Sequence, residues 1–465
     1  MTEVQPCRLF LVRRGETTAD DRPALSPQQA QLTSKGRQQA AGVGSLLGPL
    51  GIDAIFTSAG LGSRETAEVI GSGRDTPIIV DSALDPVRRG KIESMSLPEM
   101  ESVQTPFATW LRVEADGRLP PEHPGIASDL RFPGGESVTE LFDRVQHAFL
   151  GIVGGWQDRT VVIVSDSSAL QAILCHVVAA DIRSCYRFAT PHTSVTLAEA
   201  GEDGRGVLQV LNWDLAPAAA TAGSSGEPSQ RDSQTCRVFL IRHGQAMTVE
   251  TGGQVWSHHP VGLTEKGREQ AAHAASMLRD VPLSAIYTSD LNRARETAET
   301  IGTLQQLTPA VRPDLREIAL GHFEGMTLER VYREVDESFL PWLEVTFKER
   351  FPTERFHHRA DLVFPGGESI LMLHQRVRGA FAEIVKAHAG ETIAIVSHTW
   401  VIQPLLCHVT ACDPSQYFRF GLRYATMTMA EVDAQGRGVL AMLNGGLDLR
   451  EVAGGRLFAT APGAS

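Results

Sequence analysis

The chain has 465 residues, of which 42% are hydrophobic and 21% are charged, and its formal net charge is −12 at pH 7. This composition is typical of a globular protein, and the length predicts roughly two to four domains. The acidic balance argues against a broad surface for nucleic acid or an anionic membrane, although it allows a small basic pocket.

Residues 1–10 carry no charged-then-apolar leader pattern. No apolar run reaches the roughly 18 residues that a helix needs to span a bilayer. We therefore expect a cytoplasmic protein. The six cysteines form no Cys-x-x-Cys pair, which favours small buried thiols over a zinc site or a disulfide framework.

The first predicted strand and the turn after it, residues 8–15, return later in the chain as residues 237–244. Four further segments recur in the same order. The offset is 229 residues between Arg14 and His243, and 232 residues between Asp166 and His398. An offset this constant indicates two copies of one domain. The other matched segments are 132–137 with 364–369, 161–166 with 393–398, 174–177 with 406–409, and 205–208 with 437–440.

The repeat divides the chain into four predicted regions. Residues 1–215 form a first domain and residues 236–450 form a second. Between them, residues 216–235 are rich in Ala, Pro, Gly and Ser without apolar periodicity, which is typical of a flexible linker. The small, Gly- and Ala-rich tail at 451–465 is expected to be frayed. We expect the two domains to pack on each other within the chain.

In the second copy, three apolar runs indicate strands that are buried on both faces, because their apolar residues are consecutive and do not alternate with polar ones. Helical patterns lie among them, the first with Thr264 as its N-cap. This order predicts an α/β domain with a mainly parallel central sheet and right-handed crossovers. The predicted strands are 238–241, 285–288 and 392–396, and the predicted helices are 264–278, 292–301 and 371–388.

Chemically active side chains follow the predicted strands of the second copy. The first strand leads into Arg242 and His243, and the last leads into His398. Arg293 follows the second strand, and Glu317 follows a shorter segment. Ligands of open parallel sheets bind beyond the carboxyl ends of the strands. We therefore expect two histidines, at least two arginines and a glutamate to meet at one edge.

These motifs resemble the histidine phosphatase superfamily, the family of cofactor-dependent phosphoglycerate mutase and its phosphatase relatives. The matching motifs are Arg-His-Gly, Ser-x-Leu-x-Arg-Ala, Leu-x-Glu, Gly-x-Phe-Glu-Gly and a late Ser-His, and the resemblance covers residues 237–448. It implies two phosphoglycerate mutase-like, three-layer α/β/α domains, each with a mainly parallel central sheet. It also implies a metal-independent phosphatase without a cofactor, acting on a small phosphomonoester.

The resemblance assigns roles to five residues. His243 matches the phosphorylated histidine, and an imidazole with a pKa of about 6.5 is nucleophilic near neutral pH without a separate base. Arg242 and Arg293 match the phosphate-binding arginines, whose planar guanidinium groups donate two hydrogen bonds at once. His398 matches the donor that stabilises the transferring phosphoryl group. Glu317 matches the general acid that protonates the leaving alkoxide and then activates water.

The first copy lacks four of these five groups, and only Arg13 survives, at the position of Arg242. An arginine stays protonated and cannot accept a phosphoryl group. We therefore expect an inactive copy with a structural or regulatory role, in which Arg14 and Asp166 pair across the former pocket. The replacements are Arg14 for His243, Gly62 for Arg293, Pro86 for Glu317 and Asp166 for His398.

Two alternative functions stay open. Phosphoglycerate mutases share the pocket. After the first motif, however, this chain has Gln245 and Ala246 and not the Ser/Thr-x-x-Asn pattern that would resemble the mutases. The second alternative is a phosphometabolite-binding protein without turnover. This alternative suits the first copy and fits the second copy poorly, because all five pocket residues are present in the second copy. The sequence does not specify the substrate, an effector, the oligomeric state or the pathway.

The segment 326–363 of the second copy lies where the family carries a cap over the pocket. Its basic residues would suit a substrate with additional negative charge. Its interleaved acidic residues favour a solvated helical face equally well. The pairs His258–His259 and His357–His358 are expected to be exposed loop residues, not metal ligands.

Overall fold

The computed structural model describes residues 5–21, 28–93, 129–213, 234–246, 254–255, 257–340 and 359–447. The chain divides into two compact units, Met1–Asp214 and Leu215–Ser465. The predicted tail and all but the last two residues of the predicted linker lie outside the described residues. Within these ranges, no helix is long and apolar enough to cross a membrane.

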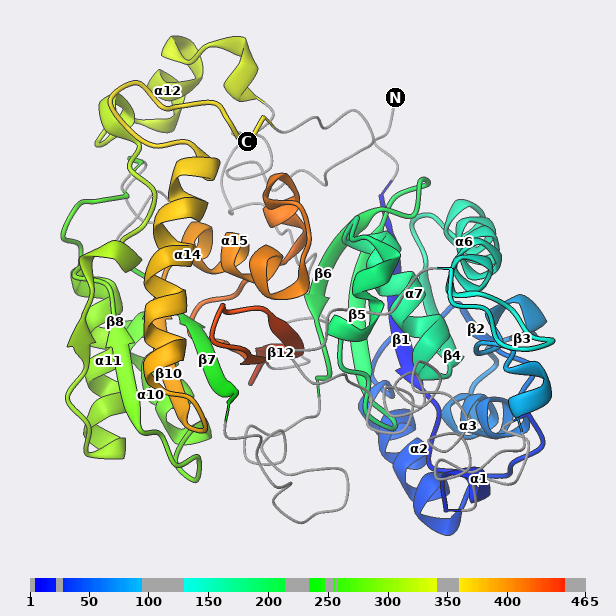
Figure 1. Cartoon of the computed structure of the whole chain (residues 1–465). Helices are drawn as coiled ribbons and strands as arrows, with labels where there is room; N and C mark the ends of the chain where they lie inside the picture. Colours follow the sequence, from blue (N-terminus) through cyan, green and yellow to red (C-terminus); the bar gives the residue numbers. More distant parts are fainter. Residues whose placement is uncertain are drawn as a thin grey trace. The chain divides into compact units, whose positions relative to one another are not determined.

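The first unit is built around a six-stranded sheet (Figure 1). Its strands are β1 (Cys7–Arg13), β2 (Ala54–Thr57), β3 (Ile78–Val80), β4 (Thr160–Ser165), β5 (Val195–Ala200) and β6 (Gly206–Val210). Its helices are α1 (Thr18–Asp21), α2 (Ser34–Leu46), α3 (Leu61–Gly71), α6 (Val138–Gly155) and α7 (Ser167–Val177), with short 3-10 helices η1 (Ser82–Leu84), η2 (Gly90–Ile92) and η3 (Ile182–Arg187). The strand order is β3-β2-β4-β1-β5-β6. Strands β1 to β4 pair in parallel, and β5 and β6 form an antiparallel edge.

The second unit repeats this plan. Its strands are β7 (Cys236–Arg242), β8 (Ala285–Thr288), β9 (Ala310–Val311), β10 (Thr392–Ser397), β11 (Met427–Val432) and β12 (Gly438–Gly445). Its helices are α10 (Glu265–Met277), α11 (Asn292–Gln305), α12 (Leu328–Glu334), α14 (Ile370–Ala387) and α15 (Thr399–Thr410), with 3-10 helices η4 (Pro313–Leu315), η5 (Gly321–Phe323), η6 (Glu337–Phe339) and η7 (Pro414–Arg419). The strand order β12-β11-β7-β10-β8-β9 again joins parallel strands to an antiparallel edge.

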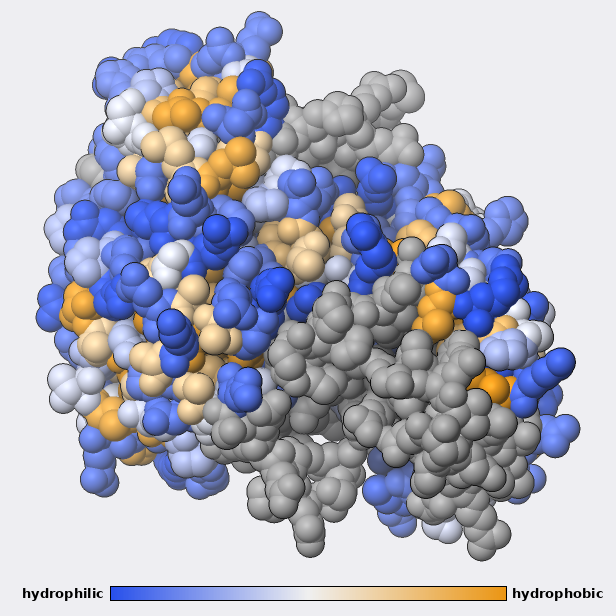
Figure 2. Space-filling view, viewed as in Figure 1, coloured by the Kyte–Doolittle hydropathy of each residue, from blue (hydrophilic) through white to orange (hydrophobic). Residues whose placement is uncertain are grey.

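Helices flank each sheet in pairs. In the first unit α2 packs on α3 and α6 on α7, and in the second α10 packs on α11 and α14 on α15. Central strands β4 and β10 are almost entirely buried, as consecutive apolar residues require. On the face shown in Figure 2, hydrophilic residues cover much of the described surface. The prediction of two three-layer α/β/α domains with mainly parallel sheets is confirmed.

The predicted element boundaries in the second copy agree closely with the structure. The strand at 285–288 is found at the predicted residues, and Thr264 caps its helix by accepting a hydrogen bond from the backbone N–H of Gly267. The helix predicted at 292–301 is too short, because α11 continues to Gln305. It ends where Gln306 adopts the left-handed conformation, with φ of 57°.

Equivalent hydrogen bonds support the alignment of the two copies. The Ser165 hydroxyl donates to the Leu84 carbonyl in the first unit, and the Ser397 hydroxyl donates to the Leu315 carbonyl in the second. Both bonds tie the end of a central strand to the 3-10 helix beside it. The residues at the sheet edge of one unit can therefore be compared with those of the other, position by position.

Candidate active site

The candidate site lies at the carboxyl ends of β7, β8 and β10. These strands are parallel neighbours, so the residues that follow them meet at one edge. The His243 backbone N–H donates to the Ser397 carbonyl across 3.0 Å, which joins two of the strand ends. The rings of His243 and His398 are 5.1 Å apart between centroids.

His243 is buried, and its hydrogen bonds define its protonation. Its Nδ1 is 2.7 Å from the Gly244 carbonyl, which can only accept, so Nδ1 carries the proton. Its Nε2 accepts from Nε of Arg293 across 3.2 Å. Burial lowers the pKa of His243 well below its ordinary value, and the positive charges of Arg293 and Arg242 lower it further. The ring is therefore a neutral imidazole with a lone pair on Nε2.

Two arginines border this ring. Arg293, the second residue of α11, is buried and donates to the carbonyls of Ser257 at 2.6 Å and His259 at 3.3 Å. Arg242 donates to the Leu422 carbonyl at 3.0 Å, and its guanidinium stacks 3.6 Å from the centre of the Tyr424 ring. Both cations are therefore held in place before any anion binds.

Glu317 is a buried carboxyl group. It accepts a hydrogen bond from the Ile318 backbone N–H at 3.0 Å. Burial raises the pKa of Glu317 to about 7, because desolvation of the carboxylate outweighs the hydrogen bond from Ile318 and the charge of Arg293. A carboxyl group with this pKa is partly protonated at neutral pH and can donate a proton.

The loop that contains Ser257 is held by a carboxylate. Glu324 accepts from the backbone N–H groups of Ser257 and His258, each at 3.0 Å. This loop presents the carbonyls that hold Arg293. Glu324 belongs to the Gly-x-Phe-Glu-Gly motif, but the sequence motif did not reveal this role.

One prediction about the histidine pairs was wrong. His258 is half-buried, and its Nε2 donates to the Glu317 carbonyl at 2.8 Å, so it borders the site instead of lying exposed in a loop. His259 is exposed, as expected. His357 and His358 lie outside the described residues. Within the described ranges, no cluster of three His, Cys, Asp or Glu side chains could hold a metal ion.

Only part of the predicted cap lies within the described residues, because 341–358 fall outside them. In the part that is described, Arg330 pairs with Glu334 and Arg333 pairs with Glu329, one helical turn apart on α12. All four side chains are at least one-third exposed. For α12, these pairs favour the solvated helical face over a set of cations reserved for substrate.

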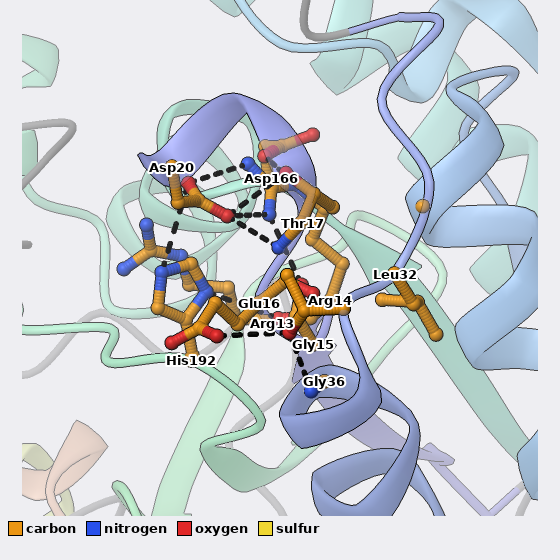
Figure 3. Close-up of polar contacts among 12 residues, drawn as sticks. Arg13, Arg14, Gly15, Glu16, Thr17, Asp20, Leu32, Gly36, Asp166 and His192 are labelled. Atoms are coloured by element: carbon orange, nitrogen blue, oxygen red, sulfur yellow. Dashed lines mark hydrogen bonds and ion pairs between the residues drawn. The ribbon is translucent and has the colours of Figure 1, made fainter. Parts of the chain in front are cut away.

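The equivalent edge of the first unit is occupied by an internal charge cluster (Figure 3). Arg14 is buried, and its Nε donates to Asp166 at 2.6 Å, so the predicted pair across the former pocket is confirmed. The same guanidinium donates to Asp20 of α1 at 2.8 and 3.2 Å. Asp20 also accepts from the backbone N–H and hydroxyl of Thr17, at 2.6 and 2.9 Å.

At Gly62, the position of Arg293 in the second unit, a side chain would meet residues of this cluster. A Cβ atom added to Gly62 would lie 2.5 Å from the Thr17 methyl group and 3.4 Å from Cδ of Arg14. Burial alone would raise the pKa of Asp20. The pKa nevertheless lies below its ordinary range, because Arg14 donates to the carboxylate. Burial, with the nearby charge of Arg13, lowers the pKa of His192 to about 3.

Comparisons with known proteins place both units in one family. The family model described as "Histidine phosphatase superfamily (branch 1)" matches residues 9–214 and 238–445. Phosphoserine phosphatase 1 of Hydrogenobacter thermophilus is 29% identical over 208 residues, 45% of this chain and 92% of that protein. Phosphoglycerate mutase-like protein 4 of Arabidopsis thaliana is 34% identical over 188 residues, 38% of this chain and 74% of that protein. The solved structure of a mycobacterial glucosyl-3-phosphoglycerate phosphatase is 25% identical, with a TM-score of 0.39, and covers 45% of this chain and 99% of that chain.

Proposed function

The chain belongs to the histidine phosphatase superfamily, and we propose that its second unit hydrolyses a small phosphorylated metabolite through a phosphohistidine on His243. Relatives named as phosphoserine phosphatases in Hydrogenobacter thermophilus and Arabidopsis thaliana support phosphoric monoester hydrolysis. The observation that carries the proposal is the hydrogen bonding of His243. Its Nδ1–H is committed to the Gly244 carbonyl, and the lone pair on Nε2 faces Arg293.

In the first step, Nε2 of His243 attacks the phosphorus atom of the substrate. The bond from phosphorus to Nε2 forms while the bond from phosphorus to the ester oxygen breaks. Glu317 gives its proton to the departing alkoxide. The guanidinium groups of Arg242 and Arg293 bind the equatorial phosphoryl oxygens, and His398 donates to the same group as charge builds up.

In the second step, the ionised Glu317 takes a proton from a water molecule. The resulting hydroxide attacks phosphorus while the bond from phosphorus to Nε2 breaks, which releases orthophosphate and returns the electron pair to Nε2 of a neutral His243. A single carboxyl group therefore acts first as an acid and then as a base. The pKa of Glu317, which burial raises to about 7, suits both roles near neutral pH.

For the first unit we infer a copy without turnover that serves a structural or regulatory role. The position of the nucleophile is occupied by Arg14, which remains protonated. The donors that a phosphoryl oxygen would need are already taken, because Asp20 accepts from Thr17 and Arg14. A carboxylate in this place also repels a second anion.

The test is turnover by the purified full chain with EDTA present. We expect hydrolysis of p-nitrophenyl phosphate with a burst of nitrophenol, and release of orthophosphate from members of a panel that includes phosphoserine and 3-phosphoglycerate. Absence of phosphatase activity on every panel member, or full dependence on a divalent cation, would overturn the proposal. Formation of 2-phosphoglycerate from 3-phosphoglycerate without release of orthophosphate would indicate a mutase instead.

A further inference from the structure

Ser289 lies directly after strand β8 and contacts one of the two pocket histidines. The residue is fully buried, and its Oγ is 2.7 Å from Nε2 of His398. The same oxygen accepts a hydrogen bond from the Leu291 backbone N–H at 3.4 Å. The backbone N–H of Ser289 donates to the Val396 carbonyl, which anchors the serine between the ends of two strands.

These contacts select one tautomer of His398. Among the described residues, Nε2 of His398 is the only acceptor within hydrogen-bond distance of the Ser289 hydroxyl, while the Leu291 N–H donates to the serine oxygen, so the hydroxyl proton points to Nε2. His398 is neutral, because burial and the charge of Arg293 lower its pKa well below the ordinary value. A neutral ring that accepts through Nε2 must carry its own proton on Nδ1.

The remaining nitrogen of this ring is then a donor without an acceptor. Nδ1 of His398 is buried and has no hydrogen-bond partner among the described residues. A buried polar group in this state is rare in folded proteins and needs an explanation. Its surroundings supply one, since the ring lies 5.1 Å from the ring of His243. A phosphoryl oxygen bound at His243 is therefore a candidate acceptor for the Nδ1–H.

The first unit contains the same serine without the histidine. Ser58 follows β2, is fully buried, and anchors its backbone N–H on the Val164 carbonyl at 3.1 Å. Its Oγ has no hydrogen-bond partner in the described part of the chain. The residue aligned with His398 is Asp166, whose carboxylate is bonded to Arg14 (Figure 3). The chain therefore carries a matched pair of buried serines, of which one contacts a pocket histidine.

We propose that Ser289 is a positioning residue of the phosphatase reaction, which fixes His398 as the Nδ1–H tautomer and so aims a donor at the transferring phosphoryl group. This inference rests on the proposed function of the second unit. Without the serine hydroxyl, the ring can turn or place its proton on Nε2. The Nδ1 lone pair would then face the incoming anion, and the transition state would lose a donor.

The kinetic test compares Ser289→Ala with Ser58→Ala in the full chain. We expect Ser289→Ala to lower kcat about tenfold with KM changed less than about twofold, a smaller loss than the roughly 10²–10³-fold of removing such a donor outright. Ser58→Ala should leave both constants at the wild-type values, because it removes a buried hydroxyl with no polar partner. Ser289→Thr keeps the hydroxyl and should recover most of the rate.

The tautomer itself is measured on the unmutated protein, so this test does not depend on how a variant folds. In ¹⁵N-histidine NMR spectra, with His398 assigned by comparison with His398→Gln, we expect the proton on Nδ1. A proton on Nε2 of His398 in the wild type would overturn the proposal. So would a kcat within twofold of wild type for Ser289→Ala, or an equal loss in Ser58→Ala.

The two proposals fail in different ways. If the wild-type chain hydrolyses no phosphomonoester, or stays active after His243→Ala, the proposed function is wrong. If those results stand as expected while the His398 proton lies on Nε2, only the role of Ser289 is wrong.

Discussion

The first strand of each unit ends in nearly the same peptide, Arg-Arg-Gly in one and Arg-His-Gly in the other. In the second unit, the imidazole of His243 lies beside two guanidinium groups and offers a lone pair. In the first, the guanidinium of Arg14 lies between the carboxylates of Asp166 and Asp20. The arginines of the second edge donate to backbone carbonyls, whereas Arg14 of the first edge donates to two carboxylates. Equivalent strand ends can thus carry either a histidine beside two arginines or a balanced cluster of buried charges on the same backbone plan.

The largest expected effect comes from removing the residue at the end of the first strand in each unit. His243→Ala should lower kcat/KM at least about 10⁴-fold, because it removes the proposed nucleophile. Arg14→Ala should leave turnover unchanged at temperatures where the protein stays folded. The assay is hydrolysis of p-nitrophenyl phosphate, together with trapping of an acid-labile phosphoprotein. Loss of turnover in Arg14→Ala, or a phosphoprotein formed by His243→Ala, would break the comparison.

Next in size is the loss of the proton donor, which only the second unit has. Glu317→Gln should lower kcat by roughly 10²–10³-fold, the contribution of a positioned acid and base. The first step needs the protonated acid, so wild-type kcat/KM should fall as the pH rises through the Glu317 pKa of about 7. His243 is neutral far below that pH, because its pKa is lowered, so the acidic limb should lie lower still. A wild-type profile that stays flat from about pH 6 to 8.5 would contradict this assignment of Glu317.

The third prediction concerns the free energy of unfolding. Replacing the residue after the first strand should destabilise the first unit more than the second. Arg14→Met leaves Asp20 and Asp166 without their cation and should cost about 3 kcal/mol of unfolding free energy at pH 7, as for other broken buried pairs. His243→Met removes a neutral ring and should cost less than about 1.5 kcal/mol. Chemical denaturation of the full chain measures both.

The ion pair of Arg14 with Asp20 also predicts how the stability cost of Arg14→Met depends on pH. The folded pKa of Asp20 is lowered, so the stability that Arg14 provides is present above the unfolded carboxyl pKa and is lost as the pH falls below it. The deficit of Arg14→Met should therefore shrink below about pH 4. A deficit that grows in acid, or no deficit at pH 7, would show that the cluster does not stabilise the first unit.

The last variant, Arg14→His, is expected to have no effect on turnover. Arg14→His places a histidine at the end of β1, but Asp166 and Pro86 still stand where a donor and an acid are needed, and Gly62 provides no guanidinium. In a chain that also carries His243→Ala, we expect no turnover from this change. Measurable hydrolysis by the double variant would mean that the nucleophile alone separates the two units. It would also mean that the charge cluster does not close the first pocket.

Much of the site was predictable because Arg242, His243 and His398 end or directly follow strands, while Arg293 lies at the start of α11 and Glu317 lies two residues after η4. The repeat, the parallel strands and the five pocket residues all depend on local pattern, and parallel pairing then brings the strand ends together. The pairing of Arg14 with Asp166 could be predicted in the same way, since both residues follow neighbouring parallel strands. The roles of these residues stay predictions until the variants are measured.

The sequence by itself determined which residues reach the sheet edge of each unit, because the local run of apolar residues sets where each strand ends. Only the tertiary structure decided what those residues meet there. Asp20 reaches Arg14 through the fold of a short helix after β1, and His258 reaches the Glu317 carbonyl across a loop. The pKa of Glu317 depends on its burial, and the tautomer proposed for His398 depends on its contact with Ser289. The contact of His258 with Glu317 joins residues 59 apart in sequence, and the contact of Arg14 with Asp20 depends on how helix α1 turns the chain back toward β1, so no local pattern specifies either one.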